Sequence, residues 1–248
     1  MKTTLSRLRA PGSALTTSML VGALLLGSVP IVSQAEVSFN VGVASNYLFR
    51  GVTQTDDKAA IQGGIDFEAD SGFYLGTWAS NVDFDGAGYE LDLYLGFASE
   101  LDNGLGFDVG YVYYAYPDAN PDDIDFGEVY ATISYGSFSG GLAYTIHSDN
   151  DDDLFDTGDV YFHLGLEFDL PADLGLGLMA GYYDFKNDGK LGVGDANYWH
   201  LGASLSRAFD VVGEISFNVE YADISSSDAL GSPNSKDPKV WVGWTLDF

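Results

Sequence analysis

The stretch Tyr89-Glu90-Leu91-Asp92-Leu93-Tyr94-Leu95-Gly96-Phe97 alternates between two kinds of residue. Its odd positions are large and apolar, while its even positions are charged, small or amphipathic. In a β-strand, residues two apart lie on the same face, whereas a helix would scatter these leucines around its axis. The stretch therefore predicts a strand with one apolar face and one polar face.

The same period of two recurs from Val37 to the last residue and predicts a chain made of strands. Twelve are expected, at 37–44, 60–69, 73–80, 89–98, 105–114, 126–135, 138–147, 159–168, 174–183, 198–205, 214–221 and 239–248. Mostly tight turns, at 70–72, 102–104, 136–137, 170–173 and 206–213, alternate with longer acidic loops at 46–58, 81–88, 115–125, 148–158, 184–196 and 222–238. Short turns on one rim and long loops on the other are typical of bacterial outer-membrane barrels, whose short turns face the periplasm. The pattern predicts an all-β fold, a closed antiparallel transmembrane β-barrel of about twelve strands with both termini periplasmic.

The first 35 residues are expected to be a cleaved secretory signal peptide, so that residues 36–248 form the barrel domain. Three basic residues precede an apolar stretch at 14–29, and Ser33-Gln34-Ala35 places small residues where a signal peptidase cleaves. The remaining chain has 7 basic and 37 acidic residues. Such a charge repels nucleic acid and favours cations. These features predict export to the outer membrane of a Gram-negative bacterium.

Composition excludes several other classes of protein. The chain has no cysteine, which excludes disulfide scaffolds, thiolate metal sites and cysteine nucleophiles. After Ala35 no run of 18 apolar residues occurs, which excludes a membrane-spanning helix. Aromatic residues make up 15% of the chain, too many for a disordered acidic tail. The apolar residues must therefore be buried or face lipid through the period of two.

Carboxylates inside the predicted strands all fall on the polar face of their strand. A charge turned toward hydrocarbon is costly, and this explains their placement in a membrane barrel. Aromatic residues gather near the strand ends, where two girdles would meet the membrane interfaces. The nine carboxylates are Asp66, Glu68, Glu90, Asp92, Asp108, Glu128, Glu167, Glu214 and Glu220.

The last predicted strand ends the chain on an aromatic residue. Val240, Val242, Trp244, Leu246 and Phe248 share its apolar face. A terminal aromatic on an amphipathic strand resembles the signal that barrel-assembly machinery recognises in outer-membrane proteins. Phe248 is therefore the expected assembly signal, and the expected partners are that machinery, outer-membrane lipid and lipopolysaccharide.

Three stretches carry a resemblance to a known family. Residues 45–54 read Ser-Asn-Tyr-Leu-Phe-Arg-Gly-Val-Thr-Gln, residues 60–63 read Ala-Ile-Gln-Gly, and residues 71–82 read Ser-Gly-Phe-Tyr-Leu-Gly-Thr-Trp-Ala-Ser-Asn-Val. These resemble the TorF family of predicted porins, also called the Gcw_chp family, and the similarity extends over the chain after Ala35. The resemblance implies an outer-membrane location and a transport role.

The leading functional hypothesis is passive passage of small solutes, with a preference for cations because an acidic lumen within a low-dielectric wall focuses its field. Arg50 is expected to reach across the barrel mouth and fix the first loop. A plugged structural barrel is the alternative, with Tyr74, Tyr94, Tyr130 and Tyr161 filling the lumen and the carboxylates hydrogen-bonded to neighbours. The expected pore-lining residues are Arg50, Asp66, Glu68, Glu90, Asp92, Asp108, Glu128, Glu167 and Glu220.

Two further classes of function have weaker support in the sequence. An outer-membrane enzyme would need a histidine beside a nucleophile or activated water, and His147, His163 and His200 all have inward parity in the predicted strands. Acidic loops at 118–123, 149–153 and 184–189 carry oxygen ligands suitable for calcium, although solvated loops explain them as well. No catalytic residue, metal site or cofactor is predicted, and no feature predicts the oligomeric state.

Overall fold

The computed structural model describes residues 36–120, 124–149, 154–190, 194–224, 230 and 236–248, so the expected signal peptide lies outside the described residues. All regular elements of the described chain are strands. None of the described residues forms a helix long and apolar enough to cross a membrane. The strands are β1 (Glu36–Ala44), β2 (Leu48–Phe49), β3 (Val52–Thr53), β4 (Ala60–Glu68), β5 (Phe73–Phe84), β6 (Ala87–Glu100), β7 (Leu105–Ala115), β8 (Phe126–Tyr135), β9 (Phe138–Ser148), β10 (Val160–Leu170), β11 (Leu174–Asp184), β12 (Tyr198–Phe209), β13 (Gly213–Ala222) and β14 (Lys239–Asp247).

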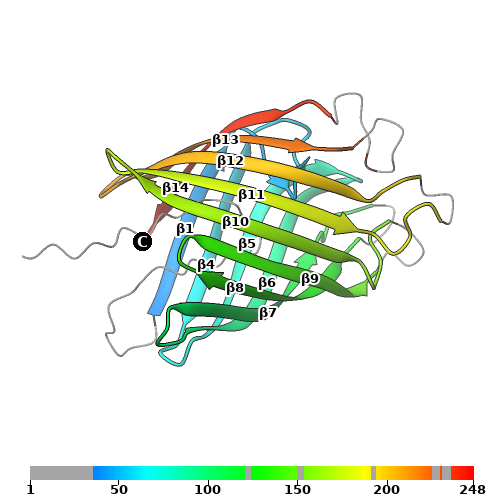
Figure 1. Cartoon of the computed structure of the whole chain (residues 1–248). Helices are drawn as coiled ribbons and strands as arrows, with labels where there is room; N and C mark the ends of the chain where they lie inside the picture. Colours follow the sequence, from blue (N-terminus) through cyan, green and yellow to red (C-terminus); the bar gives the residue numbers. More distant parts are fainter. Residues whose placement is uncertain (1–35, 121–123, 150–153, 191–193, 225–229, 231–235) are drawn as a thin grey trace, which may run out of the picture.

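Twelve of these strands form one closed antiparallel barrel, as predicted (Figure 1). Each strand pairs with its neighbour in sequence, except that β2 and β3 form a separate hairpin. β1 pairs with β4 on one side and with β14 on the other, which closes the sheet. Closure removes the unpaired strand edges that an open sheet would present.

The seam between β1 and β14 ends at Phe248. Phe39 and Phe248 exchange two backbone N–H···O hydrogen bonds of 2.9 Å. Their rings stack at a centroid distance of 5.9 Å on the outer face of the barrel. The terminal aromatic residue therefore completes the closing pair of strands.

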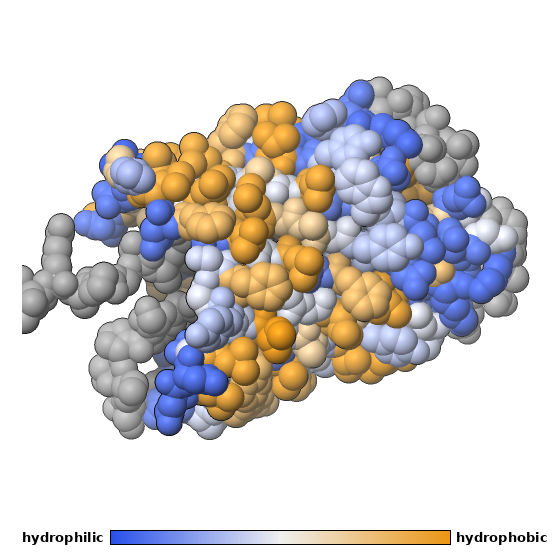
Figure 2. All heavy atoms as spheres, in the orientation of Figure 1, coloured by the Kyte–Doolittle hydropathy of each residue, from blue (hydrophilic) through white to orange (hydrophobic). Residues whose placement is uncertain are grey.

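The alternation sorts side chains between the two faces of the wall. In β6, Leu93 and Leu95 are about half exposed, at 51% and 50%, whereas Glu90 and Asp92 are each 2% exposed. Figure 2 shows apolar residues across the middle of the visible wall and hydrophilic residues gathered at the end with the long loops. An apolar exterior around a polar interior is the arrangement that a lipid environment requires of a barrel.

The segment 81–88 was predicted to be a long loop, and this prediction was wrong. β5 continues to Phe84 and β6 begins at Ala87, so that only Asp85 and Gly86 turn the chain. Both turn residues have positive φ, 46° and 79°, which suits a two-residue hairpin turn. Asp and Gly are the residue types that adopt this conformation readily, so the turn chemistry was readable from the sequence.

The β2–β3 hairpin was not predicted, because its strands of two residues are too short to show a period. Leu48 pairs with Thr53 and Phe49 with Val52. The two residues between them, Arg50 and Gly51, have φ values of 51° and 84°. Two successive positive φ values define a tight hairpin turn, which places the Arg50 side chain at its tip.

Candidate functional site

The first loop folds into the barrel and is held there by its own polar contacts. Asn46 donates to Asp57 at 2.8 Å, and the Thr55 hydroxyl donates to the Lys58 carbonyl at 2.6 Å. The backbone N–H of Gln54 donates to the Tyr47 carbonyl at 2.7 Å. These contacts fix the base of the β2–β3 hairpin, so that its tip is carried into the lumen.

Arg50 at the tip reaches the opposite wall and pairs with Glu128 of β8. Its two terminal nitrogens donate to the two carboxylate oxygens at 2.9 and 2.6 Å. The guanidinium also lies 4.1 Å from the ring centroid of Tyr161 and 4.8 Å from that of Tyr183. Both charged side chains are buried, at 6% and 1% exposure. The loop is thus anchored to the opposite wall by a buried, bidentate ion pair.

A second anchor holds the backbone of the hairpin tip. The Tyr198 hydroxyl of β12 donates to the carbonyl oxygen of Arg50 at 3.0 Å. A Cβ added to Gly51 would lie 2.9 Å from Cβ of His200, also on β12. The absence of a side chain at Gly51 therefore allows the hairpin to lie directly against the wall.

Aromatic and aliphatic side chains fill the lumen around this hairpin. One cluster packs the hairpin against β5, β6, β7 and β14, and a second packs loops against β9 to β13. The buried aromatic residues of the two clusters are Tyr47, Trp78, Tyr114, Tyr116, Phe126 and Trp241 in the first, and Tyr161, Tyr183, Phe185 and Tyr198 in the second. The part of the interior that surrounds the hairpin is therefore a packed core and not a wide pore.

Tyrosine hydroxyls donate hydrogen bonds to several of the carboxylates on the β4–β8 side of the lumen. The Tyr47 hydroxyl donates to Glu90 at 2.9 Å, and the Tyr74 hydroxyl donates to Asp108 at 2.6 Å. The Tyr94 hydroxyl donates to Asp66 and Tyr74 also contacts Tyr130, both at short range. These contacts are those expected of the plugged alternative, in which tyrosines satisfy the inward carboxylates.

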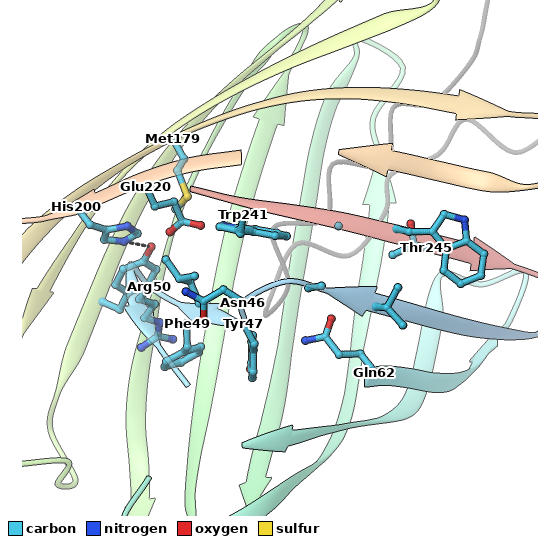
Figure 3. Close-up of a pocket in the computed structure, with 16 residues that line it drawn as sticks. Asn46, Tyr47, Phe49, Arg50, Gln62, Met179, His200, Glu220, Trp241 and Thr245 are labelled. Carbon is cyan, nitrogen blue, oxygen red and sulfur yellow. Dashed lines mark hydrogen bonds between the residues drawn. The ribbon is translucent and has the colours of Figure 1, made fainter. Parts of the chain in front are cut away.

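A cavity of about 70 Å³ remains between the first loop and the wall formed by β11 to β14, β1 and β4 (Figure 3). Of the nine residues predicted to line a pore, Arg50 and Glu220 line this cavity. Tyr47, Trp241 and Met179 also line it and were not predicted. Its other functional groups belong to Asn46, Gln62, Tyr161, His200 and Thr245.

The remaining predicted residues differ in their environment. Glu90, Asp92, Asp108 and Glu128 are buried within the barrel. Asp66 is half-buried, and Glu68 and Glu167 are exposed toward the rim with the short turns. The inward carboxylates therefore fall into a buried group deep in the lumen and an accessible group near the short-turn rim.

His147 lies on the outer face, so the prediction of inward parity was wrong for this histidine. The register between β8 and β9 shifts at a β-bulge, where Glu128 faces Thr145 and Gly127 faces His147. The extra residue, Ile146, reverses the parity of the residues after it. The His147 ring stacks on Tyr113 at 6.0 Å, and its Nε2 lies 3.2 Å from Asp149.

The other two histidines lie inside the barrel. The Tyr161 hydroxyl lies 2.9 Å from Nε2 of His200, and His163 lies 3.4 Å from the Thr132 hydroxyl. Both rings stack on the Tyr161 ring, at 5.8 and 6.0 Å. These contacts make the two histidines part of the packed lumen wall.

The acidic loop 184–189 uses its oxygen atoms in contacts within the protein. Asp188 accepts hydrogen bonds from the backbone N–H groups of Ala196 and Asn197 at 2.6 and 3.0 Å, which lower the pKa of this carboxyl. Lys186 pairs with Asp156 of the neighbouring loop at 2.8 Å. Across the described residues there is no group of three acidic or histidine side chains placed to hold a metal ion. Parts of the other two acidic loops, 121–123 and 150–153, lie outside the described residues.

The barrel is similar in fold to solved porins. A KdgM porin aligns with a TM-score of 0.53 and 9% identity, covering 85% of this chain and 98% of that chain. A KdgM porin in complex with disordered oligogalacturonate aligns at 0.53 and 8% identity, covering 87% and 98%. A NanC porin aligns at 0.50 and 11% identity, covering 86% and 98%. The chain therefore has a porin-like outer-membrane β-barrel fold.

The family is established by the sequence itself. Residues 31–244 match the Gcw_chp family, which is described as a bacterial protein of unknown function. The chain belongs to this family, and the resemblance predicted from the first loop and the following strands is confirmed at that level. Among curated proteins the comparison found no match.

Proposed function

We propose that this chain is a porin-like channel of a Gram-negative outer membrane, which passes small solutes passively and prefers cations. The observation that carries the proposal is the cavity between the first loop and the β11–β14 wall, into which the buried carboxylate of Glu220 opens. Arg50 lines the same cavity, but its charge is matched by Glu128. The excess charge along this route is negative, and a low-dielectric wall strengthens its effect on a passing ion.

The proposed route follows from the two groups of inward carboxylates. Glu68 and Glu167 would attract cations at the short-turn rim, and Asp66 would meet them farther in. The first loop then forms the constriction. In this proposal a signal peptide directs export, and barrel-assembly machinery recognises the strand that ends at Phe248. Catalysis is no part of the proposed function.

A non-conducting barrel is the second candidate, favoured by the packing of the lumen. Two apolar clusters and the Arg50–Glu128 ion pair surround a cavity of only about 70 Å³. If the first loop stays fixed, such a barrel would serve as a structural or surface-binding protein. Conduction therefore depends on whether the route beside the loop is continuous or becomes so when the loop moves.

Planar bilayer recording with the purified protein separates the two candidates. A potassium chloride gradient should give single-channel steps whose reversal potential shifts toward the equilibrium potential of potassium. Absence of steps would support the non-conducting barrel. Steps whose reversal potential shifts toward the equilibrium potential of chloride would contradict the cation preference, although the barrel would still be a channel.

A further inference from the structure

We propose that the cavity beside Glu220 is a binding site for a small organic cation, a primary ammonium group carrying a short alkyl tail. This inference rests on the proposed function, because it names the class of solute that the cation-preferring route would hold. Glu220 would be its charge partner, and the side chains of Trp241 and Met179 would contact its alkyl part.

Glu220 is a buried carboxylate that lies on the wall of the cavity. The residue is 6% exposed, and it lines the cavity. Among the described residues no basic side chain forms an ion pair with it. Lys239 is its direct cross-strand neighbour, but the Lys239 ammonium pairs with Asp57 at 2.6 Å. Burial makes an ionised carboxylate costly without a positive partner, so a cation is the ligand that this site would favour.

The surroundings of Glu220 favour an organic cation over a metal ion. Figure 3 shows the carboxylate between His200 and Trp241, with the Met179 sulfur close by. Hard cations such as calcium need six to eight oxygen ligands, and the described residues hold no acidic or histidine cluster of three. An aromatic ring and a thioether instead suit an organic cation, because they can contact its alkyl part while the carboxylate takes its charge.

The barrel already holds one organic cation by the same means. The Arg50 guanidinium is bound by one carboxylate, that of Glu128, and by ring faces 4.1 to 4.8 Å away. Glu220 beside Trp241 provides a second carboxylate next to an aromatic ring, in the cavity that Arg50 also lines. The Arg50 site shows that this combination is compatible with the lumen wall.

The size of the cavity limits the ligand. About 70 Å³ of space corresponds to about five water-sized groups. Methylammonium and ethylammonium would fit with accompanying water, whereas tetrapropylammonium would not. Gln62 also lines the cavity, and its amide oxygen can accept a hydrogen bond from an ammonium N–H group.

Calorimetric titration of the purified full-length protein with methylammonium chloride, in a potassium chloride background, tests the site. We expect saturable binding at one site per chain, and binding weakened about tenfold or more in Glu220→Gln. Glu100→Gln is the matched control, since Glu100 is exposed at the short-turn rim and away from the cavity, and it should bind as the unaltered protein does. Tetrapropylammonium should not compete.

A second variant covers the case in which Glu220→Gln does not fold. Trp241→Leu removes an aromatic face and should weaken methylammonium binding several-fold while leaving the carboxylate in place. The inference is overturned if the unaltered protein shows no saturable binding, or if Glu220→Gln binds within about twofold of it. Bilayer recording of the same preparations separates the two proposals: cation-preferring conduction without methylammonium binding refutes this site alone, whereas binding without conduction refutes the channel alone.

Discussion

The ion pair between Arg50 and Glu128 gives the sharpest prediction about the first loop. Replacing Glu128 with Gln keeps the shape of the side chain but removes the charge that faces the guanidinium. Two hydrogen bonds, of 2.9 and 2.6 Å, then lose their charged acceptor in a site where both partners are almost fully buried. Removing one member of a buried ion pair typically costs about 3–5 kcal/mol.

The cost in this protein should lie near the lower end of that range, because the amide oxygen of Gln can still accept one hydrogen bond from the guanidinium. We expect Glu128→Gln to lose about 3 kcal/mol of the free energy that holds the loop in place. Since about 1.4 kcal/mol corresponds to a factor of ten, the population with a displaced loop should rise by about two orders of magnitude. Single-channel recording should then show larger or more frequent openings.

A double-mutant cycle measures the ion pair directly. Denaturant unfolding in detergent micelles, with Arg50→Gln, Glu128→Gln and the double variant, should give a coupling energy of about 2 kcal/mol or more. The control is the Lys58–Asp83 pair, which has a 2.6 Å contact but is 62% and 59% exposed and should show no measurable coupling. A coupling below about 0.5 kcal/mol, with unchanged conductance in Arg50→Gln, would refute the anchoring role.

Three further predictions concern the hairpin turn, the barrel seam and an outer loop. Gly51→Ala should destabilise the lumen position of the hairpin by at least about 1 kcal/mol, because φ is +84° and the new Cβ would lie 2.9 Å from His200; an unchanged unfolding midpoint would contradict this. Deleting Phe248 removes two backbone hydrogen bonds and a ring stack, so the fraction that folds into a heat-modifiable barrel should fall on gels. Backbone hydrogen bonds lower the pKa of Asp188, so its contribution to stability is complete above the ordinary Asp pKa of about 4 and is lost as pH falls through the lowered value; the protection of the Ala196 amide against hydrogen exchange, relative to a free amide at the same pH, should fall only at that low pH.

The strands were predictable because their period depends on a local property. Each residue in a strand points to the face opposite to that of its neighbours, so the residue type at alternate positions indicates which face meets lipid and which faces the lumen. Leu93 and Glu90 lie on the faces that their positions predict. The exceptions have local causes, since the bulge at Ile146 reversed His147 and the Asp85–Gly86 turn shortened an expected loop.

The first loop could not be placed by the same reasoning. Its residues show no periodic pattern. Nothing in the sequence around Tyr47 indicates whether its side chain lies in the lumen or in solvent. Trp241 was closer to prediction, because its position in β14 is of inward parity, opposite to that of Val240 and Val242. Its contact with the cavity nevertheless depends on the approach of the hairpin from elsewhere in the chain.

The sequence by itself determined the barrel, the faces of its strands and the acidic character of its interior, because each follows from the order of neighbouring residues. Only the tertiary structure decided which carboxylates remain available to a solute. Arg50 reaches Glu128 across 78 positions of the chain, and Tyr47 reaches Glu90 across 43, whereas Glu220 opens into the cavity. Such pairings depend on how a closed sheet brings distant residues together around a small interior, so the local sequence pattern does not predict them.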